Sequence, residues 1–219
     1  MPQPRKLHDQ YFKKAKAEGY VARSAYKLIE INDKKRILKH GSRVLDLGCA
    51  PGSWLQVAEQ IIGPKGLAVG VDLQRVDAPL GPRVHVLQGD VFNVDPRELL
   101  AEAGGQPFTV VLSDMAPSTT GHGDDFLSVR LCRRVLELLS AVLQPGGAVL
   151  MKVLEGAEFP DLLKETKKLF KEAGATKPAA SREVSREIFI VGTGYRPPAH
   201  LAPKPAPRPP SPQAPQDQP

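Results

Sequence analysis

The sequence predicts an α/β fold, a mostly parallel, doubly wound sheet with helices on both faces. Short segments rich in β-branched residues alternate with longer segments of helical periodicity. The short segments are mostly apolar, as expected of strands that are buried on both faces. The first of them ends in a glycine-bearing turn, "DLGCAPG". Because sheets of this kind bind ligands beyond the carboxyl ends of their strands, we expect the functional residues there.

The expected elements follow one another along the chain. Residues 21–38 form a basic, amphipathic helical stretch before the first strand. The expected strands cover residues 43–48, 67–73, 83–90, 108–114, 147–154 and 186–192. The expected helices cover residues 54–62, 96–103, 125–142 and 159–173, the last closed by Gly174. The folded unit then covers about residues 8–195.

The length and composition indicate one domain with a tail. The chain has 219 residues, of which 41% are hydrophobic, enough for an ordinary core. From Arg196 onward, Pro, Ala and Gln dominate, and such a segment cannot bury enough apolar surface to fold. We therefore expect a basic N-terminal segment (1–20), a compact domain (21–195) and an extended Pro/Ala-rich tail (196–219).

Nothing in the sequence indicates a membrane segment, a leader or a metal site. No apolar run approaches the roughly 18 residues of a membrane helix, and the N-terminus lacks the apolar stretch of a signal peptide. Cys49 and Cys132 are too few for a disulfide framework and lack metal-ligand spacing. We expect a reduced, cytoplasmic protein.

The positive charge is concentrated at the N-terminus. Residues 1–43 hold twelve Lys or Arg and four acids, a net charge of +8 against +6 for the whole chain. Such a block favours a polyanion such as RNA, and the alternative is the solvated face of a helix. The candidate phosphate contacts are Arg5, Lys6, Lys13, Lys14, Lys16 and Arg23. The aromatic residues among them could stack a base: Tyr11, Phe12, Tyr20 and Tyr26.

The glycine turn and three acids predict a nucleoside ligand without phosphates. The turn matches neither G-x-G-x-x-G nor a P-loop, which disfavours a pyrophosphate. Asp72, Asp90 and Asp114 each end or follow a strand, where a carboxylate suits ribose hydroxyls or an adenine amino group. For any single Asp, the alternative is a helix N-cap. S-adenosylmethionine, a nucleoside with a cationic sulfonium, fits this set.

With these motifs the sequence resembles the FtsJ/RrmJ family of RNA 2′-O-ribose methyltransferases, especially its bacterial 23S ribosomal RNA branch. The resemblance covers about residues 9–195 and rests on "DQYFKKAKAEGYVARSAYKLIEI", "VLDLGCAPGSW", "GVDL", "LSDMAPSTTGH", "LMKV" and "SREIFIV". It implies a Rossmann-like S-adenosylmethionine-dependent methyltransferase fold, and methyl transfer to a uridine of 23S rRNA in the large ribosomal subunit.

The resemblance also implies roles for particular residues. Matched motif by motif, the family's catalytic tetrad falls on Lys27, Asp114, Lys152 and Glu187. Its cofactor contacts fall on Gly52, Trp54, Asp72, Asp90 and Asp114, and we add the neighbouring Gly48, Pro51, Leu73 and Val91. Where many relatives have alanine and glycine in the first loop, this chain has the small residues Cys49 and Ser53.

The chemistry of methyl transfer to a ribose explains why such residues are needed. The hydroxyl must be aligned and must lose its proton, in a site that excludes water. We expect Lys152 to take the proton, Asp114 to orient it, Lys27 to position the ribose, and Glu187 to hold Lys27 or the ribose. A lysine accepts a proton only in its neutral form, which a nearby cation favours.

Spacing alone leaves other interpretations open. On spacing alone, the pattern favours Lys27 as a surface lysine. It also allows Glu187 as a partner of Arg186 or Arg182, and Trp54 as a core residue. The alternative functions are the same chemistry on a tRNA or another RNA, a non-catalytic RNA-binding ribosome-assembly factor, and a dinucleotide-dependent oxidoreductase. The missing dinucleotide fingerprint disfavours the last.

Overall fold

The computed structural model describes residues 5–117, 123–181 and 185–198, with side chains from residue 10 onward. Its centre is a seven-stranded sheet with the order β3-β2-β1-β4-β5-β7-β6. The strands are β1 (Arg43–Leu47), β2 (Leu67–Asp72), β3 (Val84–Gln88), β4 (Phe108–Ser113), β5 (Leu143–Leu154), β6 (Phe170–Thr176) and β7 (Glu187–Tyr195). Strands β1 to β5 pair in parallel, and β7 runs antiparallel to both β5 and β6. The prediction of a mostly parallel α/β sheet is confirmed.

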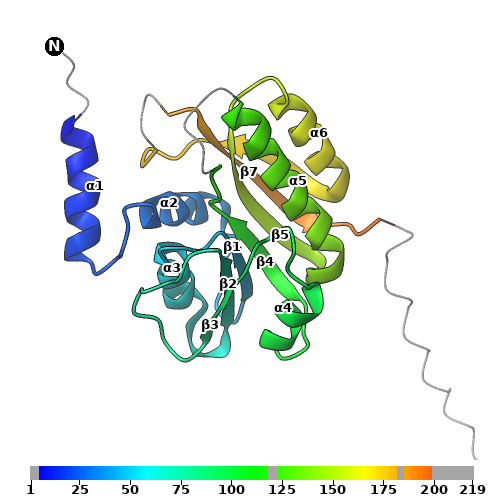
Figure 1. Ribbon diagram of the computed structural model, residues 1–219, viewed down its shortest axis with the longest axis horizontal. Helices are drawn as coiled ribbons and strands as arrows, with labels where there is room; N and C mark the ends of the chain where they lie inside the picture. Colours follow the sequence, from blue (N-terminus) through cyan, green and yellow to red (C-terminus); the bar gives the residue numbers. More distant parts are fainter. Residues whose placement is uncertain (1–4, 118–122, 182–184, 199–219) are drawn as a thin grey trace, which may run out of the picture.

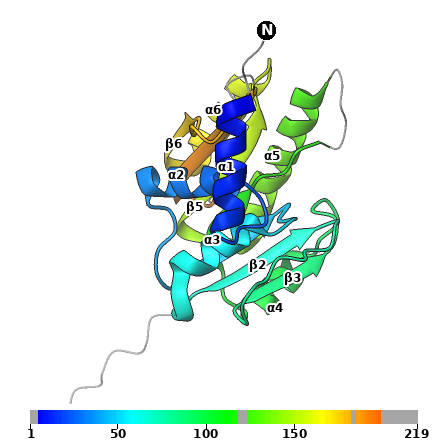
Figure 2. The same cartoon turned by 90° about the vertical axis from the view of Figure 1, so that its left-hand side faces the viewer.

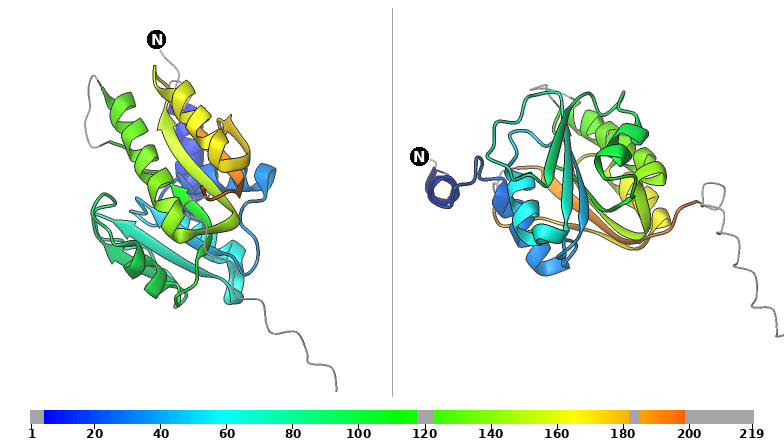
Figure 3. Two further views of the ribbon diagram at one scale, coloured as in Figure 1. Left: turned by 90° about the vertical axis from the view of Figure 1, so that its right-hand side faces the viewer. Right: turned by 90° about the horizontal axis from the view of Figure 1, so that it is seen from below.

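Helices cover both faces of this sheet, as a doubly wound fold requires (Figures 1 and 3). The helices are α1 (Arg5–Ala17), α2 (Ala25–Lys35), α3 (Ser53–Ile62), the short 3₁₀ turn η1 (Gly63–Lys65), α4 (Pro96–Glu102), α5 (Asp124–Val142) and α6 (Phe159–Leu169). Helices α2 and α3 pack on one face, and α4, α5 and α6 pack on the other. None of the helices in the described part of the chain is both long and apolar enough to cross a membrane.

Strand β1 shows how the apolar sequence builds two cores at once. Successive side chains of a strand point to opposite faces of the sheet. Val44 is fully buried in the core beneath α2 and α3, while Leu45 and Leu47 are fully buried in the core beneath α5. Because both faces are covered, the strand needs apolar residues at successive positions, which is the pattern that predicted it.

The C-terminal half of the sheet departs from the sequence prediction. The helix expected over residues 159–173 ends at Leu169, and the next residue, Phe170, begins strand β6. Its position opposite Tyr195 of β7, with ring centroids 5.4 Å apart, fixes the start of the strand. Gly174 therefore lies within β6 and does not close a helix. The sequence has no helix-terminating residue at position 169, so the helical pattern continues past it. Pairing with β7 nevertheless makes the following residues a strand.

The N-terminal segment forms a helix, α1, that packs on α2 (Figures 1 and 2). The Tyr11 hydroxyl donates to Glu30 at 3.0 Å, and the Tyr26 hydroxyl donates to Glu18 at 2.8 Å. The rings of Tyr11 and Tyr20 also contact the ring of Tyr26, which is 3% exposed. The expectation that these tyrosines stack RNA bases is therefore wrong for Tyr26, because it is buried between α1 and α2.

Of two further predictions, one is confirmed in part and the other falls largely outside the described residues. The helical stretch expected over residues 21–38 is shorter and covers Ala25–Lys35 as α2. The tail expected from residue 196 lies almost wholly outside the described residues, as do residues 118–122 of the loop after β4 and residues 182–184 before β7. The division into an N-terminal segment, a domain and a tail stays a prediction.

Candidate active site

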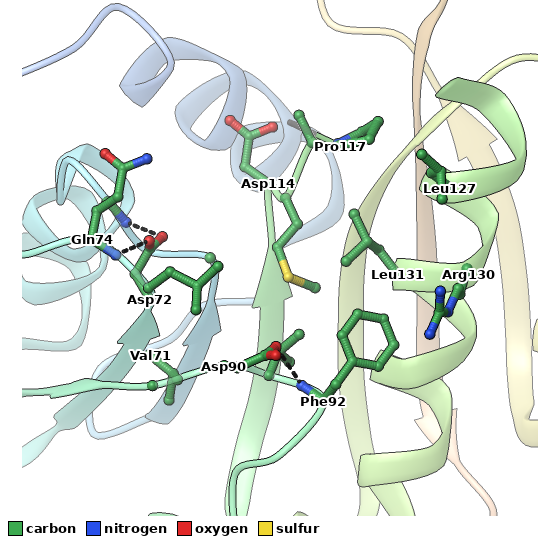
Figure 4. A pocket seen from close by; sticks show the side chains of 17 residues that line it. Val71, Asp72, Gln74, Asp90, Phe92, Asp114, Pro117, Leu127, Arg130 and Leu131 are labelled. Carbon is green, nitrogen blue, oxygen red and sulfur yellow. Dashed lines mark hydrogen bonds between the residues drawn. The ribbon is translucent and has the colours of Figure 1, made fainter. Parts of the chain in front are cut away.

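A pocket of about 530 Å³ lies at the carboxyl ends of β1, β2, β3 and β4 (Figure 4). The loops that follow these strands form most of its wall, and α5 closes the opposite side. The lining consists of Gly48, Ala50, Val71, Asp72, Leu73, Gln74, Gly89, Asp90, Val91, Phe92, Asp114, Met115, Ala116, Pro117, Leu127, Arg130 and Leu131. The pocket is where parallel strand ends converge, as the sequence predicted.

Asp72 holds the glycine turn against the end of β2. One oxygen of its carboxylate accepts the main-chain N–H of Ala50 at 2.9 Å, and the other accepts that of Gln74 at 2.8 Å. Gly48 has a φ of +78°, and a Cβ atom there would overlap the side chain of Met115. Glycine is therefore required for the chain to turn back over the pocket floor. Each carboxylate oxygen keeps a lone pair for a ligand.

Asp90 organises the opposite end of the pocket. Its carboxylate accepts the main-chain N–H of Phe92 at 2.9 Å and the side-chain amide of Asn93 at 3.2 Å. The guanidinium of Arg130, from α5, lies 4.9 Å from the centroid of the Phe92 ring (Figure 4). This wall therefore combines an acid, an aromatic ring and main-chain groups, which suits the edge and face of a nucleobase.

The structure brings six of the nine predicted cofactor residues into the pocket lining: Gly48, Asp72, Leu73, Asp90, Val91 and Asp114. Pro51, Gly52 and Trp54 lie outside the described lining. Trp54 is 3% exposed, donates from its ring to the carbonyl of Ser24 at 2.9 Å, and packs on Phe189 at 6.0 Å between ring centroids. These contacts favour the core interpretation of Trp54, and a cofactor contact for these three residues stays a prediction.

Lys152 and Asp114 form a close pair between β5 and the end of β4. The ammonium of Lys152 lies 3.0 Å from Oδ1 of Asp114 and donates a hydrogen bond of 2.6 Å to the main-chain carbonyl of the same residue. Lys152 is 6% exposed, so its charge is held within the protein. Oδ1 of Asp114 accepts no hydrogen bond from any described residue, although it is buried. The Lys152 ammonium at 3.0 Å balances its charge, so the pair of Lys152 and Asp114 lies at the wall of the pocket that Asp114 lines.

Lys27 and Glu187 form a second pair, between α2 and β7. The Lys27 ammonium donates to Glu187 at 2.9 Å and lies 5.7 Å from the centroid of the Phe189 ring. Burial raises the pKa of Glu187, but the ammonium of Lys27, with a smaller effect of Lys152, outweighs it and leaves the pKa below its ordinary value. The ion pair of Glu187 is thus with Lys27, whereas the sequence also allowed Arg186, or Arg182, which lies outside the described residues.

The two pairs lie next to each other although their members are far apart in sequence. In the register of β5 and β7, Lys152 faces Phe189 and Leu154 faces Glu187, two residues away. Because Lys152 affects the pKa of Glu187, the four side chains share one electrostatic environment. Two ammonium and two carboxylate groups thus meet beside a pocket that one of them lines, which is an arrangement suited to moving a proton and orienting a hydroxyl.

Asp46 is a buried acid near this site that the sequence analysis missed. It lies within β1, is 1% exposed, and neither of its oxygens has a hydrogen-bond partner among the described residues. Burial, followed by the negative charges of Asp114 and Asp72, raises its pKa well above the ordinary value. The available signal was an acid that interrupts an apolar strand, the same signal that singled out Lys152.

Replacing Asp46 tests this protonation state. As the pH rises above about 4, the unfolded chain releases the Asp46 proton first, because the folded-state pKa is higher. The free energy of unfolding then falls by up to about 1.4 kcal/mol per pH unit until the folded-state pKa is reached. We expect Asp46→Asn to lose this dependence, so that its stability relative to wild type increases with pH. Urea unfolding from pH 4 to pH 8 measures this difference, and a constant difference would refute a raised pKa.

The predicted RNA-binding residues lie on α1 and just before α2. Lys14 is 3.9 Å from Glu18 and 4.7 Å from the centroid of the Tyr26 ring, so it helps to dock α1. Lys13, Lys16 and Arg23 have described side chains, whereas those of Arg5 and Lys6 lie outside the description. Phe12 is 60% exposed and lies on the same side of α1 as Lys16, four residues later. An RNA contact by these residues stays a prediction.

The lining fits S-adenosylmethionine better than a phosphorylated cofactor. Asp114, whose Oδ1 lies 3.0 Å from the Lys152 ammonium, adds a carboxylate to the lining, which suits a cationic group such as a sulfonium. Three acids line the pocket and Arg130 is the only cation among its described residues, so a pyrophosphate would be repelled. The described residues contain no cluster of His, Cys, Asp or Glu that could hold a metal ion.

Comparisons with known proteins show which family and relatives the chain is similar to. The family model described as "FtsJ-like methyltransferase" matches residues 20–195. The chain is similar to "Ribosomal RNA large subunit methyltransferase E" of Syntrophobacter fumaroxidans, with 51% identity over 87% of this chain and 97% of the relative. It is also similar to the protein of that name from Acinetobacter baumannii, with 43% identity over 87% of this chain and 88% of the relative. A crystal structure from Plasmodium falciparum, provisionally named a ribosomal RNA methyltransferase, shares the fold with a TM-score of 0.71 and 30% identity, over 80% of this chain and 98% of that chain.

Proposed function

Because the chain belongs to the FtsJ-like methyltransferase family, we propose that it transfers a methyl group from S-adenosylmethionine to a ribose 2′-hydroxyl in RNA. The target that we propose is a uridine of 23S rRNA in the large ribosomal subunit, in the cytoplasm. One observation carries this proposal: Asp114 both lines the pocket and pairs with Lys152, beside the pair of Lys27 and Glu187. The chain is a methyltransferase by family; the substrate and the residue roles are our inference.

The pocket would hold the cofactor through its acids. We assign Asp72 to the ribose hydroxyls, Asp90 and the ring of Phe92 to the adenine, and Asp114 with the turn at Gly48 to the methionine end. When bound, S-adenosylmethionine supplies an activated methyl group, because a neutral thioether is a good leaving group from a sulfonium. The protein has to supply alignment, a proton acceptor and exclusion of water.

We assign the proton transfer to Lys152. Its ammonium is fixed by the carbonyl and carboxylate of Asp114, so its position relative to the pocket is set before the substrate arrives. In its neutral form, Nζ would accept the proton of the attacking 2′-hydroxyl. Lys27 would hold the ribose and stabilise negative charge that develops on its oxygen, because its own position is set by Glu187. The general-base contribution of such a group is about 10²- to 10⁴-fold in rate.

The N-terminal cations would bind the phosphates of the RNA, and this can be tested on α1. We expect Lys13→Ala/Lys16→Ala to weaken binding to rRNA by about tenfold at moderate salt. The slope of log affinity against log salt should fall by roughly one to two, since each phosphate contact contributes about 0.7–0.9. Filter binding to a 23S rRNA transcript between 50 and 200 mM KCl measures both values. Unchanged affinity and slope would remove α1 from the binding surface.

The function itself is tested by offering radiolabelled S-adenosylmethionine with large ribosomal subunits, free 23S rRNA and tRNA. The proposal predicts label on 23S rRNA, either free or in the subunit. Label on tRNA alone would keep the chemistry and change the target. RNA binding without label in any sample would favour a non-catalytic assembly factor. Calorimetric titration with S-adenosylmethionine and with NAD separates a methyltransferase from an oxidoreductase, since only the first should bind.

A further inference from the structure

A second group of cations lies far from the pocket, around the turn between α2 and β1. We call it the rear basic surface and define it by the residues Lys34, Lys35, Arg36, Lys39, His40 and Lys65. All six are exposed, and none forms an ion pair with any described residue. Asp33 is the acid of the same turn. The five lysines and arginines therefore present an excess of positive charge.

The exposed Lys164, Lys167 and Lys168 of α6 also form no ion pair with a described residue, whereas some other cations of the chain are paired. Arg133 on α5 pairs with Glu158 at 2.6 Å and with Glu165 at 3.1 Å. Arg97 pairs with Asp95 at 2.7 Å. Cations that serve the stability of a surface are commonly balanced in this way, although each exposed pair contributes only about 0–1 kcal/mol. The unbalanced charge of the rear basic surface is instead available to an anionic partner.

Hydrogen bonds and buried side chains hold the turn that carries Arg36, Lys39 and His40. The N–H of Arg36 donates to the carbonyl of Asn32 at 2.7 Å, and the N–H of Leu38 donates to the Asn32 side chain at 2.8 Å. Ile37 and Leu38 are buried, at 5% and 3% exposure, and fix the turn to the core. Arg36 has a φ of 52°, and it is the one residue other than glycine with a positive φ in the described ranges. Arg36 thus keeps a left-handed backbone conformation that is unfavourable for residues other than glycine, and its side chain is exposed.

Two hollows in the surface meet at this turn. One, of about 700 Å³, lies between α2 and α3, and the other, of about 360 Å³, lies under the first residues of β1, β4 and β5. Arg36, Lys39 and His40 line both of them. Arg36 and Lys39 therefore carry positive charge at the border of both concave areas, where a charged polymer can contact both side chains at once.

The rear basic surface and the active site lie at opposite ends of the same elements. Lys27 is near the start of α2, and Arg36 follows its end, so about 14 Å of helix separates them. Strand β1 likewise runs from Arg43, next to this turn, to Leu47, next to the pocket, over roughly 13 Å. A partner that contacts both ends must span this distance, and a ribosomal RNA does.

We propose that the rear basic surface is a second RNA-binding site, which contacts phosphates of the same rRNA molecule at a segment distant from the methylated ribose. The identity of the RNA in this proposal rests on the proposed function. Its chemistry is the recognition of the phosphodiester backbone by Lys and Arg side chains, which positions the RNA and carries no base specificity. The preformed turn reduces the entropy that is lost on binding, because its main chain is already fixed.

The test compares two triple variants with the same loss of charge. Lys34→Ala/Lys35→Ala/Lys39→Ala removes three cations from the rear basic surface. Lys164→Ala/Lys167→Ala/Lys168→Ala removes three exposed cations from α6 and serves as the control. Filter binding to a full-length 23S rRNA transcript over a range of KCl concentrations gives the affinity and the salt slope. We expect the rear variant to lose tenfold or more in affinity and about two to three units of slope, and the α6 variant to lose little.

Two results would overturn the proposal. The rear variant could bind the transcript as wild type does, or both variants could lose the same affinity, which would indicate an effect of net charge alone. Circular dichroism melting curves of both variants check that each is folded before its affinity is compared. Methylation of the transcript by the wild type is measured separately, so the two proposals can fail independently. If the wild type binds the transcript but does not methylate it, the proposed function is wrong and the proposed binding site still stands.

Discussion

Lys152→Ala is expected to reduce kcat by about 10²- to 10⁴-fold while leaving the affinity for S-adenosylmethionine within about threefold of wild type. The side chain is buried against Asp114, and we assign it the proton of the ribose hydroxyl. The alanine variant removes that acceptor and replaces no residue of the pocket lining, although it takes away the ion-pair partner of Asp114. Single-turnover methylation of rRNA gives the rate, and calorimetry gives the cofactor affinity.

Lys152→Arg is the sharper control for this assignment. An arginine keeps the positive charge and the hydrogen bonds to Asp114, but it does not lose its proton in proteins. If Lys152 acts as the base, the arginine variant is as inactive as the alanine variant. If Lys152 only positions Asp114 through its charge, the arginine variant recovers much of the rate, and the base has to be sought elsewhere.

The second large effect is expected at the pair of Lys27 and Glu187. Lys27→Met should lower kcat by about 10²-fold, because it removes the group that we assign to the ribose and to the charge on its oxygen. Glu187→Gln should lower kcat by about tenfold, since it leaves Lys27 without the partner that lies 2.9 Å away. If Glu187 acts through Lys27, the double variant should be no slower than Lys27→Met alone.

The matched control for this pair is Arg186→Gln. Arg186 is exposed and adjacent to Glu187 in sequence, so it tests whether any charge change at the start of β7 has the same effect. We expect its kcat to be close to that of wild type. Multiplicative losses in the double variant would show that Lys27 and Glu187 act separately, and would contradict the role of Glu187 in holding Lys27.

Much of the fold could be predicted because its signals are local. Each parallel strand is a short apolar segment next to a turn, and strands such as β1 and β4 begin at the expected residues. Strand β6 could not be predicted, because its residues follow α6 without a break and become a strand only by pairing with β7. The start of β5 at Leu143 is similar, since α5 ends at Val142 and the strand begins with no turn between them.

The site was predictable where topology and chemistry agreed. The acids Asp72, Asp90 and Asp114 were expected together because parallel strand ends meet at one edge of a sheet. The roles of residues that commonly serve either in a core or in a ligand site were harder to predict. Trp54 and Tyr26 suit a ligand as well as a core, and the structure places both in contacts between packed elements. The pairing of Lys27 with Glu187 joins residues 160 positions apart, so only the family resemblance suggested it.

The measurement that tests the account most directly is the identity of the methylated nucleoside. Labelled 23S rRNA from the reaction is digested to nucleosides, which are separated by chromatography and identified by mass spectrometry. The arrangement of Lys27, Asp114, Lys152 and Glu187 predicts that the label resides in one 2′-O-methylated nucleoside, and that it disappears with Lys152→Ala. Label on a base, or unchanged labelling by the Lys152→Ala variant, would contradict it.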